Sequence, residues 1–579
     1  MLIRTAAIAL ALTLFPSGQS AQAAEVIYLN GPILTMAGPE PAYVEALVVD
    51  GGKISFAGAK AEALRLQTPD TKLVDLQGHA LLPGFIDGHG HMIYYGKNMI
   101  DADLVGVTSV AEVVTRMKVQ AQKMGPDDWI VGFGYRVPSL IENRHPTAAE
   151  LDQISADRPI MVVDQSGHNG AANTAMLKML GLTKDTPDPE GGSFGRNADG
   201  TLSGELEETA LFAVREQRPG FSGKLADDVA LNGSRIWASY GQTTAQECGV
   251  GLGKDDIDII RNAIDKKLLP IDLYLCAKDS MVSDVLAAAY ATSSEYETNA
   301  TGTAEKLLAE RPDIDKRYIN RVRLGGIKLW LDGSVPTTWL SEVYAHNPPG
   351  KEGDYRGFAQ VSDAYLDEFF DKFWTSNLQI NMHMNGDAAA EQALVAIERA
   401  IKKQGMADHR PVFIHATYMR PDQIKRMKDV GGFPTFTVGS LPLGGDMAVY
   451  YWGKARVDAS MAMNTLETMG IMFSLNHDAP ILPLPDVMAL VDAAVNRTTG
   501  TGMVVGEDEK ISAYVALRAV TAYPAYQIKE EKTKGTLEVG KLADLVILDQ
   551  DPLKADPKSL KDIKVLETIK EGKTIYQRQ

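Results

Sequence analysis

Two histidines, His89 and His91, directly follow the apolar run at residues 81–86. Alternate residues of a strand point to the same face, so a pair spaced i, i+2 projects both imidazoles to one side. Two nitrogen ligands from one rigid strand end form half of a site for a divalent metal. Such a pair also occurs on surface loops. It therefore indicates a metal site only if further ligands follow later in the chain.

Four more side chains that can bind a metal lie in or just after later apolar runs: Lys328, His383, His415 and Asp478. A single buried histidine is more often a satisfied core residue than a ligand. Four histidines at strand ends, together with an aspartate and an apolar-flanked lysine, are hard to explain as core packing. The spacing therefore predicts a metal site formed by His89, His91, Lys328, His383, His415 and Asp478.

These side chains need a scaffold that gathers strand ends at one place. The apolar runs that predict strands are residues 81–86, 243–246, 271–276, 324–331, 379–382, 412–414, 433–438 and 471–475. Helical patterns separate several of them; for example, Leu366, Phe369, Phe370 and Phe373 follow the spacing i, i+3, i+4, i+7. This alternation predicts an α/β fold, a TIM-like (β/α)8 barrel whose carboxyl strand ends converge on one face. Asp387 is expected to cap the helix that follows it.

The barrel is expected to comprise residues 81–95 and 235–534. Short strand patterns at both ends, residues 24–80 and 535–579, predict one composite β-sandwich, because neither set has enough strands to be stable alone. Residues 96–234 are too long for a single crossover and carry their own strand and helix patterns. They are predicted to form an inserted cap subdomain over the mouth of the active site.

Residues 1–23 have the composition of a signal peptide. Arg4 supplies the positive charge, about ten apolar residues follow, and Ala21-Gln22-Ala23 fits a cleavage site. Roughly 20 apolar residues are needed to span a bilayer, so this run is too short for an anchor. We expect an exported, periplasmic protein with no membrane contact after the signal is removed.

The net charge of −17 argues against a nucleic-acid partner, since no basic surface is available to neutralise phosphates. The partner that the sequence favours is a small-molecule substrate, and a homo-oligomer remains open. Only two cysteines occur, Cys248 and Cys276. Both are expected to be buried free thiols, and a bridge between neighbouring strands is the alternative.

Six motifs, at residues 83–91, 328–334, 383–387, 410–415, 476–480 and 534–545, resemble the metal-dependent amidohydrolase superfamily. The specific resemblance is to amidohydrolase family 3, the group that includes N-substituted formamide deformylases, and it covers essentially the whole chain after the signal segment. It implies two divalent metal ions, with zinc preferred. His89, His91 and Asp478 would hold one ion, His383 and His415 the other, and a carbamylated Lys328 would bridge them.

The resemblance also implies a catalytic set of Asp478, Lys328 and His168. Apolar neighbours desolvate Lys328 and favour the neutral amine that reacts with carbon dioxide; an unmodified lysine that contacts substrate is the alternative. A metal lowers the pKa of its water from about 15.7 towards roughly 7, and Asp478 would act as general base and then acid. His168 would bind the substrate carbonyl or oxyanion, with a loop-stabilising role as the alternative.

Trp330, Trp339 and Tyr94 are candidates to line an apolar substrate pocket, although aromatic residues near barrel ends often only pack. Two departures from the family pattern lie near the site: Asn476-His477 precedes the last aspartate, and Asn385 replaces an aliphatic residue. His477 is expected to support the site rather than bind metal.

The predicted function is hydrolysis of a non-peptide carbon–nitrogen bond in a small amide-like molecule. One alternative is a mononuclear deaminase or cyclic-amide hydrolase on the same scaffold. Another is a catalytically silent periplasmic binding protein. An unmodified Lys328 and one bound ion would favour the first alternative over the predicted two-metal hydrolase. An activity assay would separate the second alternative from either enzyme.

Overall fold

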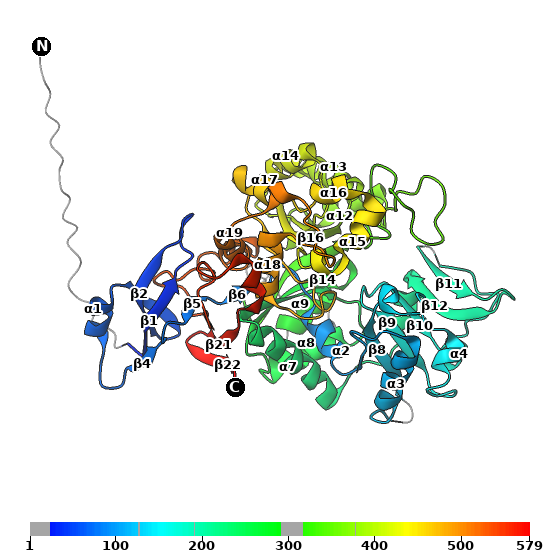
Figure 1. Cartoon of the computed structure of the whole chain (residues 1–579), viewed down its shortest axis with the longest axis horizontal. Coiled ribbons are helices and arrows are strands. Elements are labelled where there is room, and N and C mark those ends of the chain that lie inside the picture. Colours follow the sequence, from blue (N-terminus) through cyan, green and yellow to red (C-terminus); the bar gives the residue numbers. More distant parts are fainter. Residues whose placement is uncertain (1–23, 126–127, 190, 291–316, 377) are drawn as a thin grey trace, which may run out of the picture.

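The computed structural model describes residues 24–125, 128–189, 191–290, 317–376 and 378–579. Three sheets organise them: one built from both ends of the chain, a central barrel, and one in the insertion, arranged in that order along the longest axis (Figure 1). The expected signal segment, residues 1–23, lies outside the described residues. Among the described helices, none has the length and apolar character needed to cross a bilayer.

The central sheet contains eight parallel strands, as the alternation of strands and helices predicts. In spatial order they are β6 (Phe85–Ile86), β13 (Gln242–Val250), β14 (Asp272–Lys278), β15 (Val322–Trp330), β16 (Gln379–Met384), β17 (Val412–His415), β18 (Phe433–Phe436) and β19 (Ser474–Leu475). Just beyond β6 and β19, the N–H of Asp478 donates to the carbonyl of His89 at 3.2 Å. The first and last strands of the order are thereby joined at the carboxyl end.

Amphipathic helices cover the outside of the barrel. They are α7 (Gly223–Ser239), α8 (Asp256–Asp265), α9 (Val282–Tyr290), α12 (Asp363–Phe373), α13 (Asp387–Gln404), α14 (Pro421–Asp429), α15 (Ser440–Trp452), α16 (Lys454–Asp458), α17 (Met463–Thr468), α18 (Val487–Asn496), α19 (Ala513–Arg518) and α20 (Ala522–Gln527). All four apolar residues predicted to form the inner stripe of α12 are buried.

The expected capping role of Asp387 is wrong, because the residue that caps α13 is Gly386 and Asp387 already lies inside the helix. Its buried carboxylate accepts the N–H of Ser341 at 2.9 Å and pairs with Arg420 at 2.9 Å. Asp387 therefore ties together the loops around the start of α13.

The first predicted barrel strand, residues 81–86, is in fact two strands on either side of Gly84. β5 (Ala80–Pro83) pairs with β1 (Val26–Leu34) and β20 (Leu545–Leu548), whereas β6 begins the barrel. A Cβ at Gly84 would lie 2.4 Å from the Thr243 side chain, so only glycine permits this close approach. The chain passes between the two sheets at this point.

Both ends of the chain contribute to the sheet that contains β5. Its other strands are β2 (Tyr43–Asp50), β3 (Lys53–Gly58), β4 (Lys72–Asp75), β21 (Val565–Lys570) and β22 (Lys573–Gln577). β20 lies antiparallel to β5, with Leu82 opposite Val546. All eight strands belong to one pairing network, and the arrangement of the two ends as a sandwich stays a prediction.

The insertion has a six-stranded sheet in the order β11, β12, β10, β9, β8, β7. These strands are β7 (Ala102–Asp103), β8 (Ile130–Tyr135), β9 (Ile160–Asp164), β10 (Asn169–Ala172), β11 (Gly192–Arg196) and β12 (Leu202–Glu208), with helices α3 (Val110–Ala121), α4 (Ala148–Leu151), α5 (Thr174–Met179) and α6 (Thr209–Arg215). Alternating residues of β8 enter different apolar clusters, Val131 and Phe133 on one face and Ile130 on the other.

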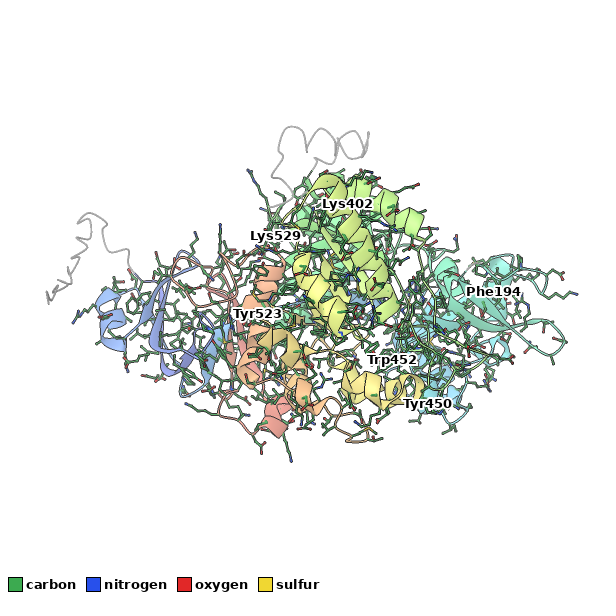
Figure 2. All side chains as sticks on the ribbon, turned by 90° about the horizontal axis from the view of Figure 1, so that it is seen from above. Phe194, Lys402, Tyr450, Trp452, Tyr523 and Lys529 are labelled. Carbon is green, nitrogen blue, oxygen red and sulfur yellow. A yellow bond between two sulfur atoms is a disulfide. The ribbon has the colours of Figure 1, made fainter. Side chains whose placement is uncertain are left out.

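The insertion lies to one side of the barrel. In Figure 2, Phe194 of β11 is far from Lys402 of α13 and Tyr523 of α20. The expected boundary at residue 234 falls inside α7, which packs against both α2 (Met92–Asn98) and α8. We therefore assign the whole of α7 to the barrel.

Cys248 and Cys276 form a disulfide, so the expectation of free thiols is wrong. Both residues are buried, as predicted. β13 and β14 are neighbours in the barrel, which brings the two Cα atoms to 4.3 Å. The alternative, a bridge between neighbouring strands, is therefore confirmed.

Candidate metal centre and substrate pocket

His89 and His91 lie just beyond β6, in the segment that leads into α2, rather than within the strand itself. The buried carboxylate of Asp87 fixes this segment: Oδ1 accepts the N–H of His89 at 3.1 Å, and Oδ2 accepts the indole N–H of Trp237 at 3.0 Å. His477 Nε2 lies 3.4 Å from Asp87 Oδ1, so it supports this segment, as predicted.

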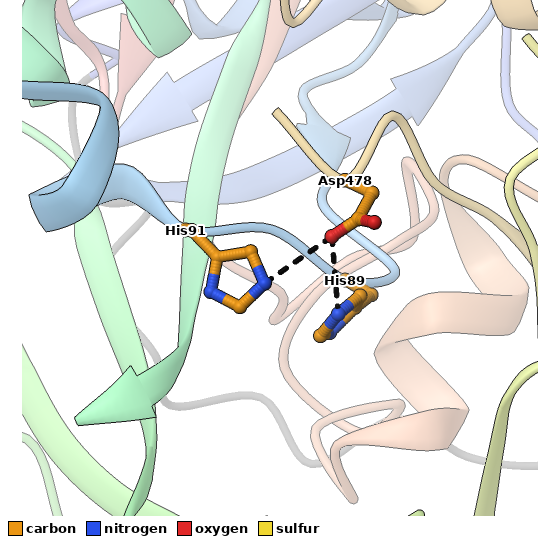
Figure 3. Close-up of side chains that lie close together, drawn as sticks. All are labelled: His89, His91 and Asp478. Carbon is orange, nitrogen blue, oxygen red and sulfur yellow. Dashed lines mark ion pairs between the residues drawn. The ribbon is translucent and has the colours of Figure 1, made fainter. Parts of the chain in front are cut away.

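Both histidines face the carboxylate of Asp478 (Figure 3). Oδ1 of Asp478 lies 3.3 Å from His89 Nε2 and 3.2 Å from His91 Nε2. The three ligand atoms all lie within 4.8 Å of one another, close enough to bind one ion. Two residues beyond β6 and one beyond β19 thus meet at the carboxyl end of the barrel.

The other predicted ligands lie beside this group. Lys328 Nζ is 3.3 Å from His89 Nε2. His415 Nε2 is 3.9 Å from Asp478 Oδ2, and the His383 and His415 rings have centroids 4.5 Å apart. All six side chains predicted as ligands therefore gather at one place, and their roles as ligands stay predictions.

A neighbouring side chain orients the Nδ1 edge of three of the histidines. The pairs are His91 with Glu247 Oε1 (3.4 Å), His383 with Asp332 Oδ1 (3.3 Å) and His415 with Thr437 Oγ1 (2.7 Å). Such partners fix the tautomer and the ring direction of metal-binding histidines. Sequence reasoning missed all three, although Glu247 and Asp332 each directly follow a predicted strand.

The two departures from the family pattern stabilise the ends of strands. Asn476 accepts the hydroxyl of Thr437 at 2.7 Å and donates to Thr435 at 2.9 Å, so it holds the residue that orients His415. Asn385 donates to the Gly333 carbonyl at 2.9 Å and accepts from a threonine hydroxyl on the next loop. Both asparagines brace the site from outside.

The backbone at two of the ligands is strained. His415 has φ 68° and Asp478 has φ 50°, both in the left-handed region that non-glycine residues avoid. Each such residue costs on the order of 1–3 kcal/mol and persists only where its surroundings enforce it. Strain of this kind at two adjacent side chains favours a functional rather than a packing role.

The charges at the site suit a cation. Burial lowers the pKa of Lys328 to about 7, against the smaller effects of Asp478 and Glu247. Burial also holds the pKa of His89 and of His415 well below the usual range, so both imidazoles are neutral and can donate lone pairs.

His91 differs from these groups. Burial alone would lower its pKa, but Asp478 and Glu247 together raise it to about 9. Oδ1 of Asp478 is buried and makes no hydrogen bond to any described residue. An acceptor oxygen left in this state, facing imidazole nitrogens, fits the ligand set of a divalent metal.

A cavity of about 480 Å³ lies between the barrel and the insertion, and the group of predicted metal ligands reaches it through His91 and Lys328. Four of the predicted functional residues line it from the barrel side: His91, Lys328, Trp330 and Tyr94. From the insertion comes His168, whose Nδ1 lies 2.8 Å from Glu208 Oε2. Burial, the largest single effect, lowers the pKa of His168, but Glu208, Asp164 and Asp478 together raise it, so the net shift is upward.

Trp339 does not line this cavity, contrary to expectation. It borders a separate, smaller cavity with residues of α12 and α13, and its backbone N–H donates to Asp332 at 3.2 Å. The turn after Gly333 carries the chain outward from β15, so Trp330 reaches the pocket whereas Trp339 faces the outer helices.

Comparison with known proteins decides the family, because the amidohydrolase family model matches residues 72–576. The chain belongs to the amidohydrolase family. It is therefore a hydrolase that acts on carbon–nitrogen bonds.

Individual relatives align with this chain over nearly the full length of both proteins. The N-substituted formamide deformylase of Arthrobacter pascens is 24% identical over 92% of this chain and 95% of its own. The protein YtcJ of Bacillus subtilis (strain 168) is 25% identical over 96% of this chain and 100% of its own. An uncharacterized metal-dependent hydrolase from Pyrococcus furiosus has a similar structure, with a TM-score of 0.69, 25% identity and coverage of 91% and 100%.

Proposed function

We propose that this amidohydrolase uses divalent metal ions to hydrolyse a non-peptide amide bond in a small molecule, in the periplasm. The observation that carries the proposal is the convergence of four histidines, Lys328 and Asp478 beside one cavity, which His91 and Lys328 line. A cavity of about 480 Å³ suits a small molecule. The formamide deformylase name of one relative and the metal-dependent hydrolase name of another support the choice.

The donor set accommodates two ions, for which zinc is the expected metal because the ligands are mainly imidazoles. His89, His91 and Asp478 would hold one, and His383 and His415 the other. When bound, the ions supply water of lowered pKa and polarise the substrate carbonyl.

Lys328 would bridge the two ligand sets as a carbamate. Its pKa of about 7 leaves much of the amine neutral, so the nitrogen attacks the carbon of carbon dioxide and loses a proton. The product carries a negative charge and two ligand oxygens where the unmodified amine has none. The ammonium form could not serve, since it has no lone pair.

Asp478 would move the proton of the reaction. One oxygen accepts the proton of the attacking water and then delivers it to the leaving nitrogen, which must be protonated before an amide bond breaks.

His168 would stabilise the charge that develops on the carbonyl oxygen. Glu208 favours the protonated form of His168, and that charge also acts on His383, whose pKa is lowered mainly by burial and partly by His168. A preoriented cation of this kind stabilises an oxyanion in a site shielded from water. Trp330 and Tyr94 flank the same space.

One observation favours the second candidate, a mononuclear deaminase or cyclic-amide hydrolase. The tight group of ligand atoms among the described residues contains His89, His91 and Asp478 alone. A single ion bound by these three residues, beside an unmodified Lys328, would make this protein a mononuclear enzyme of that kind.

The test combines metal analysis, mass spectrometry and turnover. We expect about two ions per chain, a carbon dioxide adduct on Lys328, and hydrolysis of N-formyl or N-acyl amines that chelation abolishes and metal restores. One ion with an unmodified lysine and turnover of cyclic amides or amino-heterocycles would favour the mononuclear enzyme. Binding without any turnover would indicate a silent binding protein. Cell fractionation with N-terminal sequencing tests export.

A further inference from the structure

Two arginines from one segment of the insertion line the substrate cavity, and their surroundings differ. Arg218 forms a two-pronged pair with Asp101, with contacts of 2.8 Å and 2.5 Å. Lys97, on the same wall, lies 2.6 Å from Asp256. The charges of these two cations are therefore balanced within the protein.

Arg215, the last residue of α6, has no such partner. Among the described residues its guanidinium makes one hydrogen bond, to the Gly167 carbonyl at 3.2 Å, and no salt bridge. It also lies over the ring of Tyr94, 4.6 Å from the centroid. A carbonyl and an aromatic face satisfy only part of a group with five N–H donors and a full positive charge.

Two further donors lie on α2, close to Arg215. The hydroxyl of Tyr94 and Nδ2 of Asn98 are buried and form no hydrogen bond within the described ranges. The two residues are four apart on the helix, so both side chains lie on one face. Burial raises the pKa of Tyr94, and Arg215 and Asn98 act against that shift, so both side chains lie close to the hydroxyl.

We propose that Arg215, Tyr94 and Asn98 form a subsite for a carboxylate on the substrate. Resting on the function proposed above, this assigns the substrate class as an N-acylated amino acid. A carboxylate supplies a negative charge and about four lone-pair positions, which match one guanidinium and two neutral donors. A neutral acceptor would leave the arginine charge uncompensated in a partly buried site.

The wall beside this subsite is apolar. It is formed by Val131, Phe133, Met161, Val163 and Phe212 of the insertion. These residues suit a hydrocarbon or aromatic side chain rather than a polar one. The preferred substrate therefore combines three parts: an acylated nitrogen at the metal ligands, an apolar side chain and a carboxylate at Arg215.

A matched pair of substrates tests the subsite in the metal-loaded full-length enzyme. N-formylphenylalanine (both enantiomers) and N-formyl-2-phenylethylamine differ only in the carboxylate. We expect kcat/KM to favour the former by roughly 10- to 100-fold, mainly through KM, the effect of hydrogen bonds to a charged group. Arg215→Met should abolish the preference and leave the amine substrate unchanged, whereas Arg215→Lys should restore part of it.

Lys254→Met is the matched control, because Lys254 is an exposed cation that lines the same cavity. This variant should keep the preference. Equal loss for both substrates in Arg215→Met, or no preference in the wild type, would overturn the subsite and leave the proposed function intact.

If neither compound is hydrolysed, the proposed function fails, and calorimetry then decides the subsite separately. Binding of N-formylphenylalanine to the wild type but not to Arg215→Met would support the subsite. Equal binding to both proteins, or none to either, would refute it.

Discussion

The two ends of the barrel both contain a cavity lined by buried charged groups. The cavity at the amino end is the larger, about 1150 Å³ against about 480 Å³, and lies at the starts of β14, β15 and β16. Volume alone would therefore point to the wrong end. The two ends differ in how their buried charged groups are paired.

At the amino end, opposite charges are in contact. Lys534 lies 2.7 Å from Asp272 and 2.6 Å from Glu530. Lys570 of β21 lies 2.7 Å from the same Asp272. Burial would raise the pKa of Asp272, but the two lysines hold it below its usual range. These pairs link the terminal sheet to the barrel, which is a structural role.

At the carboxyl end, the buried groups are paired less completely. Lys328 makes no salt bridge among the described residues, Asp478 has imidazoles instead of a lysine or arginine as its ion-pair partners, and the backbone of two ligands is strained. Such arrangements reduce stability and are retained where function needs them. The contrast teaches that incompletely paired buried groups, more than cavity size, mark the working end.

Among the variants proposed to test this contrast, Asp478→Asn should cause one of the largest losses of activity. An amide cannot take up the proton of water, so kcat/KM should fall by about 10²- to 10⁴-fold while the protein stays folded. Steady-state kinetics and circular dichroism measure both. Asp458→Asn, which alters a surface acid paired with Lys454, is the control and should keep full activity. Full turnover by Asp478→Asn would remove Asp478 from the mechanism.

Lysine-to-methionine changes at the two ends should have opposite outcomes. Lys534→Met leaves two buried carboxylates short of a partner and should lower the free energy of unfolding by about 3–5 kcal/mol, with activity per folded molecule unchanged. Lys328→Met should change stability by less than about 1 kcal/mol, since it breaks no ion pair, and should abolish turnover. Urea denaturation with parallel assays measures both, and equal destabilisation would contradict the contrast.

Thr437→Val tests whether the contact between Thr437 and His415 contributes to metal binding at the carboxyl end. It removes the hydroxyl that lies 2.7 Å from His415 Nδ1, and we expect metal affinity to fall by about 10- to 100-fold. Competition with a chromogenic chelator measures the affinity. Thr465→Val, which removes a hydroxyl bonded to Glu509 far from the ligands, should leave it unchanged.

Asp164→Asn should alter the pH dependence of stability. Burial raises the pKa of Asp164 to about 6, so its stabilising contribution is complete below about pH 4 and is lost as the pH rises through 6. The asparagine variant lacks this loss and should gain about 3 kcal/mol on the wild type between pH 4 and pH 8. Unfolding curves across that range measure the gain, and a constant difference would argue against the shift.

The sequence was sufficient to predict the barrel and the convergence of the six candidate ligands, because each lies in or just after an apolar run and parallel strand ends must converge. Their roles as ligands stay predictions. The partners that orient the histidines were not predicted. Thr437 and Asp332 acquire their roles only through strand register and loop shape, which single runs do not specify. The same reason explains why free thiols were favoured over the disulfide and why Trp339 was expected in the wrong cavity. Both features depend on contacts between neighbouring strands and turns, which tertiary packing determines.

The passage at Gly84 has a consequence for the order in which the enzyme matures. β5, which leads directly into the segment bearing His89 and His91, is paired on one side with β20, close to the end of the chain. A nascent polypeptide lacks that neighbour until β20 has been synthesised. We therefore expect ligand assembly to wait for β20, so that a chain cut short before Leu545 never acquires metal.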